Sequence, residues 1–98
     1  MGALFSAHPP QTDSVGDQFV VLQCIRLRPG DRICKTPSWR TRYDPTQPSD
    51  GFVEVSSSSP DITGESGAFG SSGWCVEFKD GTERLICARS TRFKCVPR

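Results

Sequence analysis

Large apolar and β-branched side chains occur in short runs along this chain, separated by stretches rich in Gly, Pro and Ser. In residues 74–79 three large apolar side chains alternate with Cys, Glu and Lys, and residues 52–56 alternate in a similar way. A period of two is typical of a strand with one buried face. No run shows the three- and four-residue spacing of an amphipathic helix. The pattern therefore predicts an all-β chain without a substantial helix.

Several of these runs are long enough to form strands. They are Phe19–Arg26, Asp31–Lys35, Phe52–Ser56, Trp74–Lys79, Arg84–Ala88 and Phe93–Val96. The pair Asp80-Gly81 lies between two of the runs, and such a pair favours the positive backbone angles of a tight hairpin turn. We expect a hairpin at this point, and a single helical turn at residues 89–91 before the last strand.

Two connections exceed about 12–15 residues, a length at which loops are usually functional or disordered. The first, Thr36–Asp50, contains three Pro, one Trp and one Tyr, and we expect it to be functional. The second, Ser57–Gly73, is rich in Ser and Gly and is expected to be a mobile linker. Residues 1–17 have no periodicity and include two consecutive Pro, so we expect a flexible leader followed by one folded domain over residues 18–98.

Composition fits one small domain and excludes some classes of protein. The 98 residues carry a net charge of +1, which excludes a protein whose whole surface attracts nucleic acid. No stretch approaches the roughly 20 apolar residues of a membrane span, and the first ten residues lack the charged and apolar regions of a signal peptide. Gly2 and Ser6 match the N-myristoylation pattern, which so short a motif also produces by chance.

The cysteines are the least usual feature of the composition. They are Cys24, Cys34, Cys75, Cys87 and Cys95. None of their spacings is the close pair that places two thiolates on one metal ion, so we expect no metal site. We expect reduced, mostly buried cysteines in an intracellular protein of the cytoplasm or nucleus. The alternative is that the cysteines form disulfides or bind a metal ion.

Catalytic chemistry has little support in the sequence. The single His, His8, falls in the expected leader, so no Ser–His or Cys–His pair can be proposed on the folded domain. The glycine motifs that bind phosphates or dinucleotides do not occur. We therefore expect a protein that is not an enzyme and needs no cofactor.

The order of the runs resembles that of an SH3-like barrel, in which a long aromatic loop follows the first strand. Residues 76–88, VEFKDGTERLICA, are similar to the strand pair of Tudor-type domains. Over residues 28–96 the chain also resembles Mind bomb-type domains of ubiquitin ligases, with counterparts of their motifs at Gly30–Ile33, Pro37–Trp39, Asp50–Val53 and Trp74–Gly81. Thr41 and Phe78 depart from that pattern, since each stands where a Trp is usual. The resemblance implies a small SH3-like (Tudor-like) barrel of five to six short antiparallel strands with two long loops.

Charge is segregated along the chain. Residues 26–42 are mainly basic, residues 44–83 are mainly acidic, and residues 84–98 carry cations only. The first and last strands of an SH3-like barrel are neighbours, so the two basic segments would form one patch. Equally, segments of opposite sign can pair across strands and only solvate the surface. A joined basic patch with aromatic side chains predicts an alternative function, the binding of RNA or single-stranded DNA.

The hypothesis that we prefer is a non-catalytic protein-interaction module that binds a peptide or protein partner through the long loop. Tudor-type domains build an aromatic cage from barrel-end loops and strand starts, so the resemblance implies a cationic or methylated tail as one partner. The candidate partner-binding residues are Trp39, Arg40, Arg42, Tyr43, Asp50, Phe52, Trp74 and Asp80. The competing interpretation is barrel core for Trp74, and a loop folded back on the core for Trp39 and Tyr43. An edge strand over Phe19–Arg26 that pairs with a partner's sheet is a third alternative.

Overall fold

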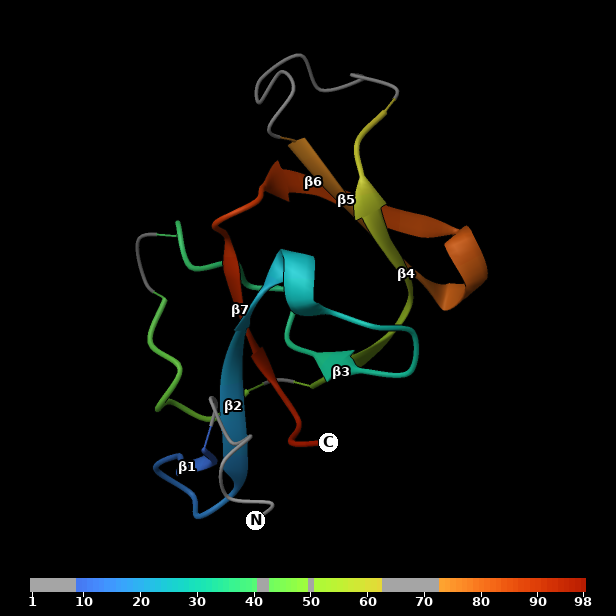
Figure 1. The fold of residues 1–98 in the computed structure, drawn as a ribbon. Coiled ribbons are helices and arrows are strands. Elements are labelled where there is room, and N and C mark those ends of the chain that lie inside the picture. The colour runs from blue at the N-terminus through green and yellow to red at the C-terminus, as the bar shows by residue number, and fades with distance from the viewer. Residues whose placement is uncertain (1–8, 41–42, 50, 63–72) are drawn as a thin grey trace, which may run out of the picture.

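The computed structural model describes residues 9–40, 43–49, 51–62 and 73–98. These residues form an all-β fold, which confirms the predicted fold class (Figure 1). The strands in this part of the chain are β1 (Gln11–Thr12), β2 (Gln18–Gln23), β3 (Arg32–Ile33), β4 (Val53–Pro60), β5 (Gly73–Phe78), β6 (Glu83–Ala88) and β7 (Arg92–Cys95). Two short 3-10 turns, η2 (Cys24–Arg26) and η4 (Lys79–Gly81), follow β2 and β5. No helix in the described ranges is long and apolar enough to cross a membrane.

All these strands belong to one antiparallel sheet with the order β1-β2-β7-β3-β4-β5-β6. The sheet curls into a half-barrel, so that β4, β5 and β6 form one wing and β2, β7 and β3 form the other (Figure 1). β3 lies next to β7, with Ile33 opposite Cys95, as expected for the first and last strands of a small barrel. β2 pairs with the other side of β7 and carries β1 at the edge of the sheet.

The turn η2 connects the two wings. The Cys24 amide donates to the Thr91 carbonyl at 2.8 Å, and the Cys24 thiol donates to the Ala88 carbonyl at 3.2 Å. From β4, the Ser58 hydroxyl donates to the Cys24 carbonyl at 2.9 Å. Because buried backbone groups need partners, these bonds stabilise the curl by tying the end of β2 to β4 and to the β6–β7 turn.

The core lies inside the curl and takes apolar side chains from both wings. Alternation along β5 and β7 turns Val76, Phe78, Phe93 and Cys95 inward. The buried cluster comprises Val20, Leu22, Cys24, Leu27, Ile33, Val55, Val76, Phe78, Cys87, Phe93 and Cys95. All the cysteines are free thiols, and each of them except Cys34 is buried.

Some element boundaries differ from those expected. β4 continues to Pro60, since its last four residues pair with residues 74–77 of β5. The expectation of a mobile linker over Ser57–Gly73 is therefore wrong for residues 57–60, which belong to β4. Residues 63–72 lie outside the described part. β2 ends earlier than expected because the chain turns into η2, and residues 89–91 form a plain turn rather than a helical one.

The N-terminal segment also differs from expectation. β1 pairs with the start of β2, and a turn over residues 13–17 joins them. Residues 11–17 therefore belong to the folded part, although a flexible leader was expected over residues 1–17. Hydrophobic periodicity cannot indicate a two-residue polar strand. Residues 1–8, which include Gly2 and the single His, lie outside the described part.

The turn between β5 and β6 has the positive backbone angles predicted for its Asp-Gly pair. The φ angle is 51° at Lys79, 56° at Asp80 and 90° at Gly81. The Thr82 amide closes the turn by donating to the Lys79 carbonyl at 3.1 Å. Glycine adopts the φ of Gly81 freely, whereas a residue with a Cβ is strained at this angle.

Replacing Gly81 by Ala should therefore lower the free energy of unfolding by about 1 kcal/mol. Gly51→Ala is the matched control, because an added Cβ meets nothing within 4 Å at either glycine and only Gly81 of the two has a positive φ. Urea titration followed by circular dichroism measures both free energies. Equal stability of the two variants would contradict a requirement for glycine at this turn.

Candidate functional site

β7 is buried on both faces from Phe93 to Cys95, although this stretch contains a lysine. The neighbours of Lys94 in the strand face the core, while Lys94 faces the outside of the sheet and is still only 3% exposed. Its ammonium donates to Asp13 Oδ2 at 3.3 Å and to the Gln47 carbonyl at 2.7 Å. It also lies 4.9 Å from the centroid of the Phe19 ring, a cation–π distance. One cation thus holds both the N-terminal turn and the long loop against the sheet.

Asp13 is the carboxylate partner of this lysine. Its Oδ1 accepts the amides of Val15 at 3.0 Å and Asp17 at 2.9 Å. Burial acts to raise the pKa of Asp13, but the hydrogen bonds from Asp17 and Val15 and the Lys94 ammonium outweigh burial and lower the pKa. The carboxyl group is therefore ionised in the folded protein at neutral pH.

The long loop is organised by turns and is anchored at both ends. Near its end, Asp44 Oδ1 accepts the Thr46 amide at 3.0 Å and the Thr46 hydroxyl at 2.7 Å, and these hydrogen bonds lower the pKa of Asp44. The Ser14 amide donates to the Thr46 carbonyl at 2.8 Å, so the N-terminal turn contacts the loop directly. Near the start of the loop, the Ser38 amide donates to the Arg92 carbonyl and the Arg92 amide donates to Ser38 Oγ, both at 3.0 Å.

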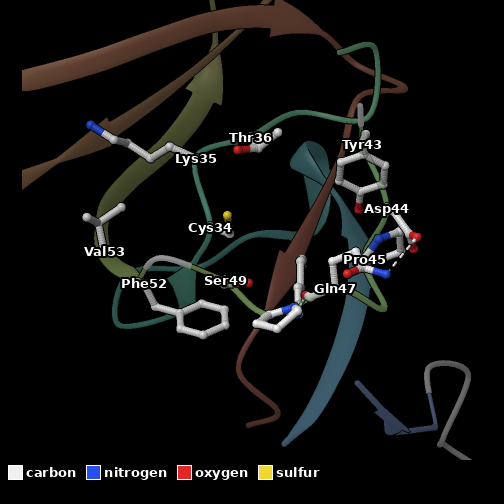
Figure 2. A pocket seen from close by; sticks show the side chains of 13 residues that line it. Cys34, Lys35, Thr36, Tyr43, Asp44, Pro45, Gln47, Ser49, Phe52 and Val53 are labelled. Atoms are coloured by element: carbon white, nitrogen blue, oxygen red, sulfur yellow. Dashed lines mark hydrogen bonds between the residues drawn. The ribbon is translucent and has the colours of Figure 1, made fainter. Parts of the chain in front are cut away.

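A pocket of about 440 Å³ lies between this loop and the ends of β3 and β4. Figure 2 shows Tyr43 and Phe52 on opposite sides of the pocket, with Cys34 and Ser49 between them. Lys94 also lines it, so the cation that holds the loop contributes to the pocket wall. The lining also includes Lys35, Asp44 and Gln47, so the pocket combines two aromatic rings with several polar groups.

The Tyr43 hydroxyl is buried and has no hydrogen-bond partner among the described residues. Figure 2 shows the ring pointing inward, with its hydroxyl toward the other lining residues. Burial raises the pKa of Tyr43 to about 12, and the neighbouring Cys95 and Cys34 add to the rise. The phenol is therefore neutral at physiological pH and retains its capacity to donate and accept a hydrogen bond.

The structure brings Tyr43 and Phe52 together, and it places an exposed aromatic residue on the same loop. Trp39 is 55% exposed, and the Arg40 guanidinium carbon lies 5.0 Å from the centroid of its ring. The Tyr43 amide donates to the Arg40 carbonyl at 3.0 Å. The exposed pair of Trp39 and Arg40 therefore lies one turn before Tyr43, which lines the pocket. The Trp39 side chain itself is not part of the pocket lining.

The other candidates do not join the pocket. Trp74, on β5, packs against the core cluster, and its indole N–H donates to the Ser58 hydroxyl at 2.7 Å. Asp80 is exposed in the η4 turn. Arg42 and Asp50 lie outside the described residues. Within the described part, the expected cage is thus reduced to two aromatic rings on opposite sides of one pocket.

Lys94, Gln47 and Cys34 form part of the site, and the sequence analysis missed all three. A lysine between apolar residues in a strand indicates an outward position exposed to solvent. Nothing local indicates that Asp13, which is 81 positions away, covers this lysine. The only signal in the sequence was the position of the lysine in the last strand of the expected barrel, beside the aromatic loop.

Comparisons of the chain with known protein families, with curated proteins and with solved structures gave no match. Among the residues that the structure describes, no group of three His, Cys, Asp or Glu is placed to hold a metal ion. The function is therefore argued from the geometry of the pocket and its surroundings.

The ion pair makes the stability of the protein dependent on acid pH. The pKa of Asp13 is lower in the folded than in the unfolded state. The contribution of Asp13 to folding stability is therefore complete above the ordinary carboxyl pKa of about 3.9, and it is lost as the pH falls below that value. We expect Asp13→Asn to melt at a lower temperature than the wild type at neutral pH. Its melting temperature should then fall less than that of the wild type as the pH is lowered.

Thermal melts between about pH 7 and pH 2, followed by circular dichroism, measure both effects. Asp80→Asn is the matched control, because Asp80 is an exposed aspartate outside the pocket lining. Its melting curve should follow that of the wild type at each pH. A curve for Asp13→Asn that runs parallel to the wild type would contradict the role of this carboxylate.

Proposed function

We propose that this protein is a non-catalytic, SH3-like interaction module that binds a peptide segment of a protein partner in the loop pocket. The observation that carries the proposal is the pocket between Tyr43 and Phe52, of about 440 Å³. Peptide side chains and small ligands are typically accepted by concave, largely apolar sites of about 300–1,000 Å³ with a few polar groups that fix orientation. The loop pocket has this size. Its apolar surface comes from the two rings with Pro45, Pro48 and Val53, and its polar groups include Lys35, Asp44 and Lys94.

The Tyr43 hydroxyl favours a ligand that carries a polar group next to its apolar part. A buried hydroxyl without a partner costs about 1–3 kcal/mol, because it has lost its hydrogen bonds to water. Because the hydroxyl is closed to water, the Tyr43 ring must turn toward the pocket for a peptide carbonyl or amide there to restore one of these bonds. The hydroxyl would then favour a peptide over a purely apolar ligand.

The exposed pair Trp39 and Arg40 supports the same function from outside the pocket. Tryptophan and arginine are enriched among the residues that contribute most to protein interfaces. Because the pair precedes Tyr43 by one turn, a peptide that enters the pocket can extend across it. Trp74 and Asp80 do not line the pocket, so we propose an apolar side chain as its occupant rather than a methylated lysine held in an aromatic cage.

The test starts from a random-peptide phage library selected on the wild-type protein. An enriched peptide is then synthesised, and its affinity for variants is measured by fluorescence anisotropy. Phe52→Ala should weaken binding about tenfold through the loss of one pocket wall. Tyr43→Phe should fold at least as stably as the wild type, since it removes an unpartnered hydroxyl, but should bind the peptide more weakly.

Ile62→Ala is the control, because Ile62 is an exposed apolar side chain beyond the far end of β4. It should leave the affinity unchanged. The proposal fails if no peptide is enriched, or if folded Phe52→Ala and Tyr43→Phe proteins bind the selected peptide as tightly as the wild type.

A further inference from the structure

A second concave site lies on the outer face of the β2–β7 ladder, beyond the part that the loop covers. In this ladder Val21 is opposite Lys94 and Gln23 is opposite Arg92, so all four residues belong to one face of the sheet. The turn η2 follows directly after Gln23 and ends with Arg26. A groove of about 320 Å³ is lined by Val21, Gln23, Arg26 and Arg92.

Neither cation of this groove has a carboxylate partner, a property that they share with other arginines of the described part such as Arg32. Lys35 and Lys79 pair with Glu83, Lys94 pairs with Asp13, and Arg98 pairs with Asp31. Arg26 and Arg92 are both exposed, and no carboxylate among the described residues pairs with either. Two positive charges at one groove disfavour each other, and a bound anion reduces this repulsion.

Exposed apolar residues flank the two arginines. Ile25 is 42% exposed and precedes Arg26 in η2. Ser38 is hydrogen-bonded to the backbone of Arg92, and the exposed Trp39 follows Ser38 in the chain. Ile25 and Trp39 are two of the exposed large apolar residues of the described part, and η2, β7 and the start of the loop meet in one region of the fold (Figure 1).

We infer that this groove, which we call the Arg26–Arg92 groove, binds an anionic side chain of an acidic peptide that also carries apolar residues. Guanidinium groups match the planar geometry of carboxylate and phosphate oxygens. The neighbouring Ile25 and Trp39 offer contacts for the apolar residues of such a peptide. Charge complementarity and exposed apolar surface therefore point to the same partner.

A peptide fits these observations better than a nucleic acid does. Nucleic-acid binding depends on several phosphate contacts along a continuous basic path. The groove has two arginines and a volume of about 320 Å³, which suits one anionic group rather than a row of phosphates. The Arg26–Arg92 groove also shares no lining residue with the loop pocket, so this site does not depend on the proposed function.

The experiment titrates the ¹⁵N-labelled protein with three probes and follows amide shifts by NMR. The probes are a six-residue peptide of Glu and Leu, the same peptide with a central phosphoserine, and an oligothymidine of eight nucleotides. We expect both peptides to shift the amides of Gln23, Arg26 and Arg92. The tighter of the two peptides identifies carboxylate or phosphate as the preferred anion.

Arg26→Gln and Arg92→Gln should each weaken peptide binding about fivefold. Arg32→Gln is the matched control, since Arg32 is an exposed arginine on β3 that does not line the groove. Phe52→Ala should also leave the affinity unchanged, which separates this site from the loop pocket. Melting temperatures by circular dichroism verify that each variant is folded, and Arg92→Lys keeps the charge if Arg92→Gln is unstable.

Three results would overturn the inference. The first is an absence of shifts at Gln23, Arg26 and Arg92 with either peptide. The second is an equal loss of affinity in Arg32→Gln, which would indicate diffuse attraction to positive charge. The third is tighter binding of oligothymidine than of both peptides with the same dependence on Arg26 and Arg92, which would assign the groove to nucleic acid.

Discussion

The buried ion pair between Lys94 and Asp13 is the interaction on which the candidate site depends. Moving a lysine ammonium out of water is expensive, and the cost is offset only where a carboxylate and further hydrogen bonds surround it. Asp13 and the Gln47 carbonyl supply these partners, at 3.3 and 2.7 Å. The pair therefore joins three segments that no strand pairing connects directly: the N-terminal turn, the long loop and the last strand.

This arrangement explains why the loop forms a pocket instead of collapsing on the sheet. A cation needs oxygen atoms at defined positions, so it fixes where Gln47 and Asp13 lie, whereas an apolar side chain would accept many arrangements. The other end of the loop is fixed by the hydrogen bonds between Ser38 and Arg92. The pocket lies between the described part of the loop and the ends of β3 and β4, and Cys34 lines it.

Most of the sheet could be predicted from the sequence, because alternation of apolar residues reports directly on which face of a strand is buried. The Asp-Gly turn could be predicted for a similarly local reason. The serine extension of β4 could not, since Ser58 is held by Cys24 and Trp74 and not by an apolar pattern. The polar strand β1 could not be predicted either, since it pairs with the start of β2 without an apolar pattern of its own.

The candidate site was predicted in part. Tyr43 and Phe52 were candidates from their places in the loop and at a strand start, and both line the pocket. Trp74 was a candidate on the same grounds, but its position in β5 places it outside the pocket. Its indole N–H donates a hydrogen bond to the Ser58 hydroxyl instead. The lysine that holds the loop could not be identified, because its role arises from a contact with Asp13 across most of the chain.

Native-state hydrogen exchange on Lys94→Met tests the role of the ion pair most directly. If Lys94 holds the loop and the N-terminal turn, the amides of Ser14 and Asp17, whose acceptors are Thr46 and Asp13, lose protection in the variant. Amides of the β5–β6 ladder, such as Val76, keep theirs. Unchanged protection at Ser14 and Asp17, or an even loss across the whole sheet, would contradict the account.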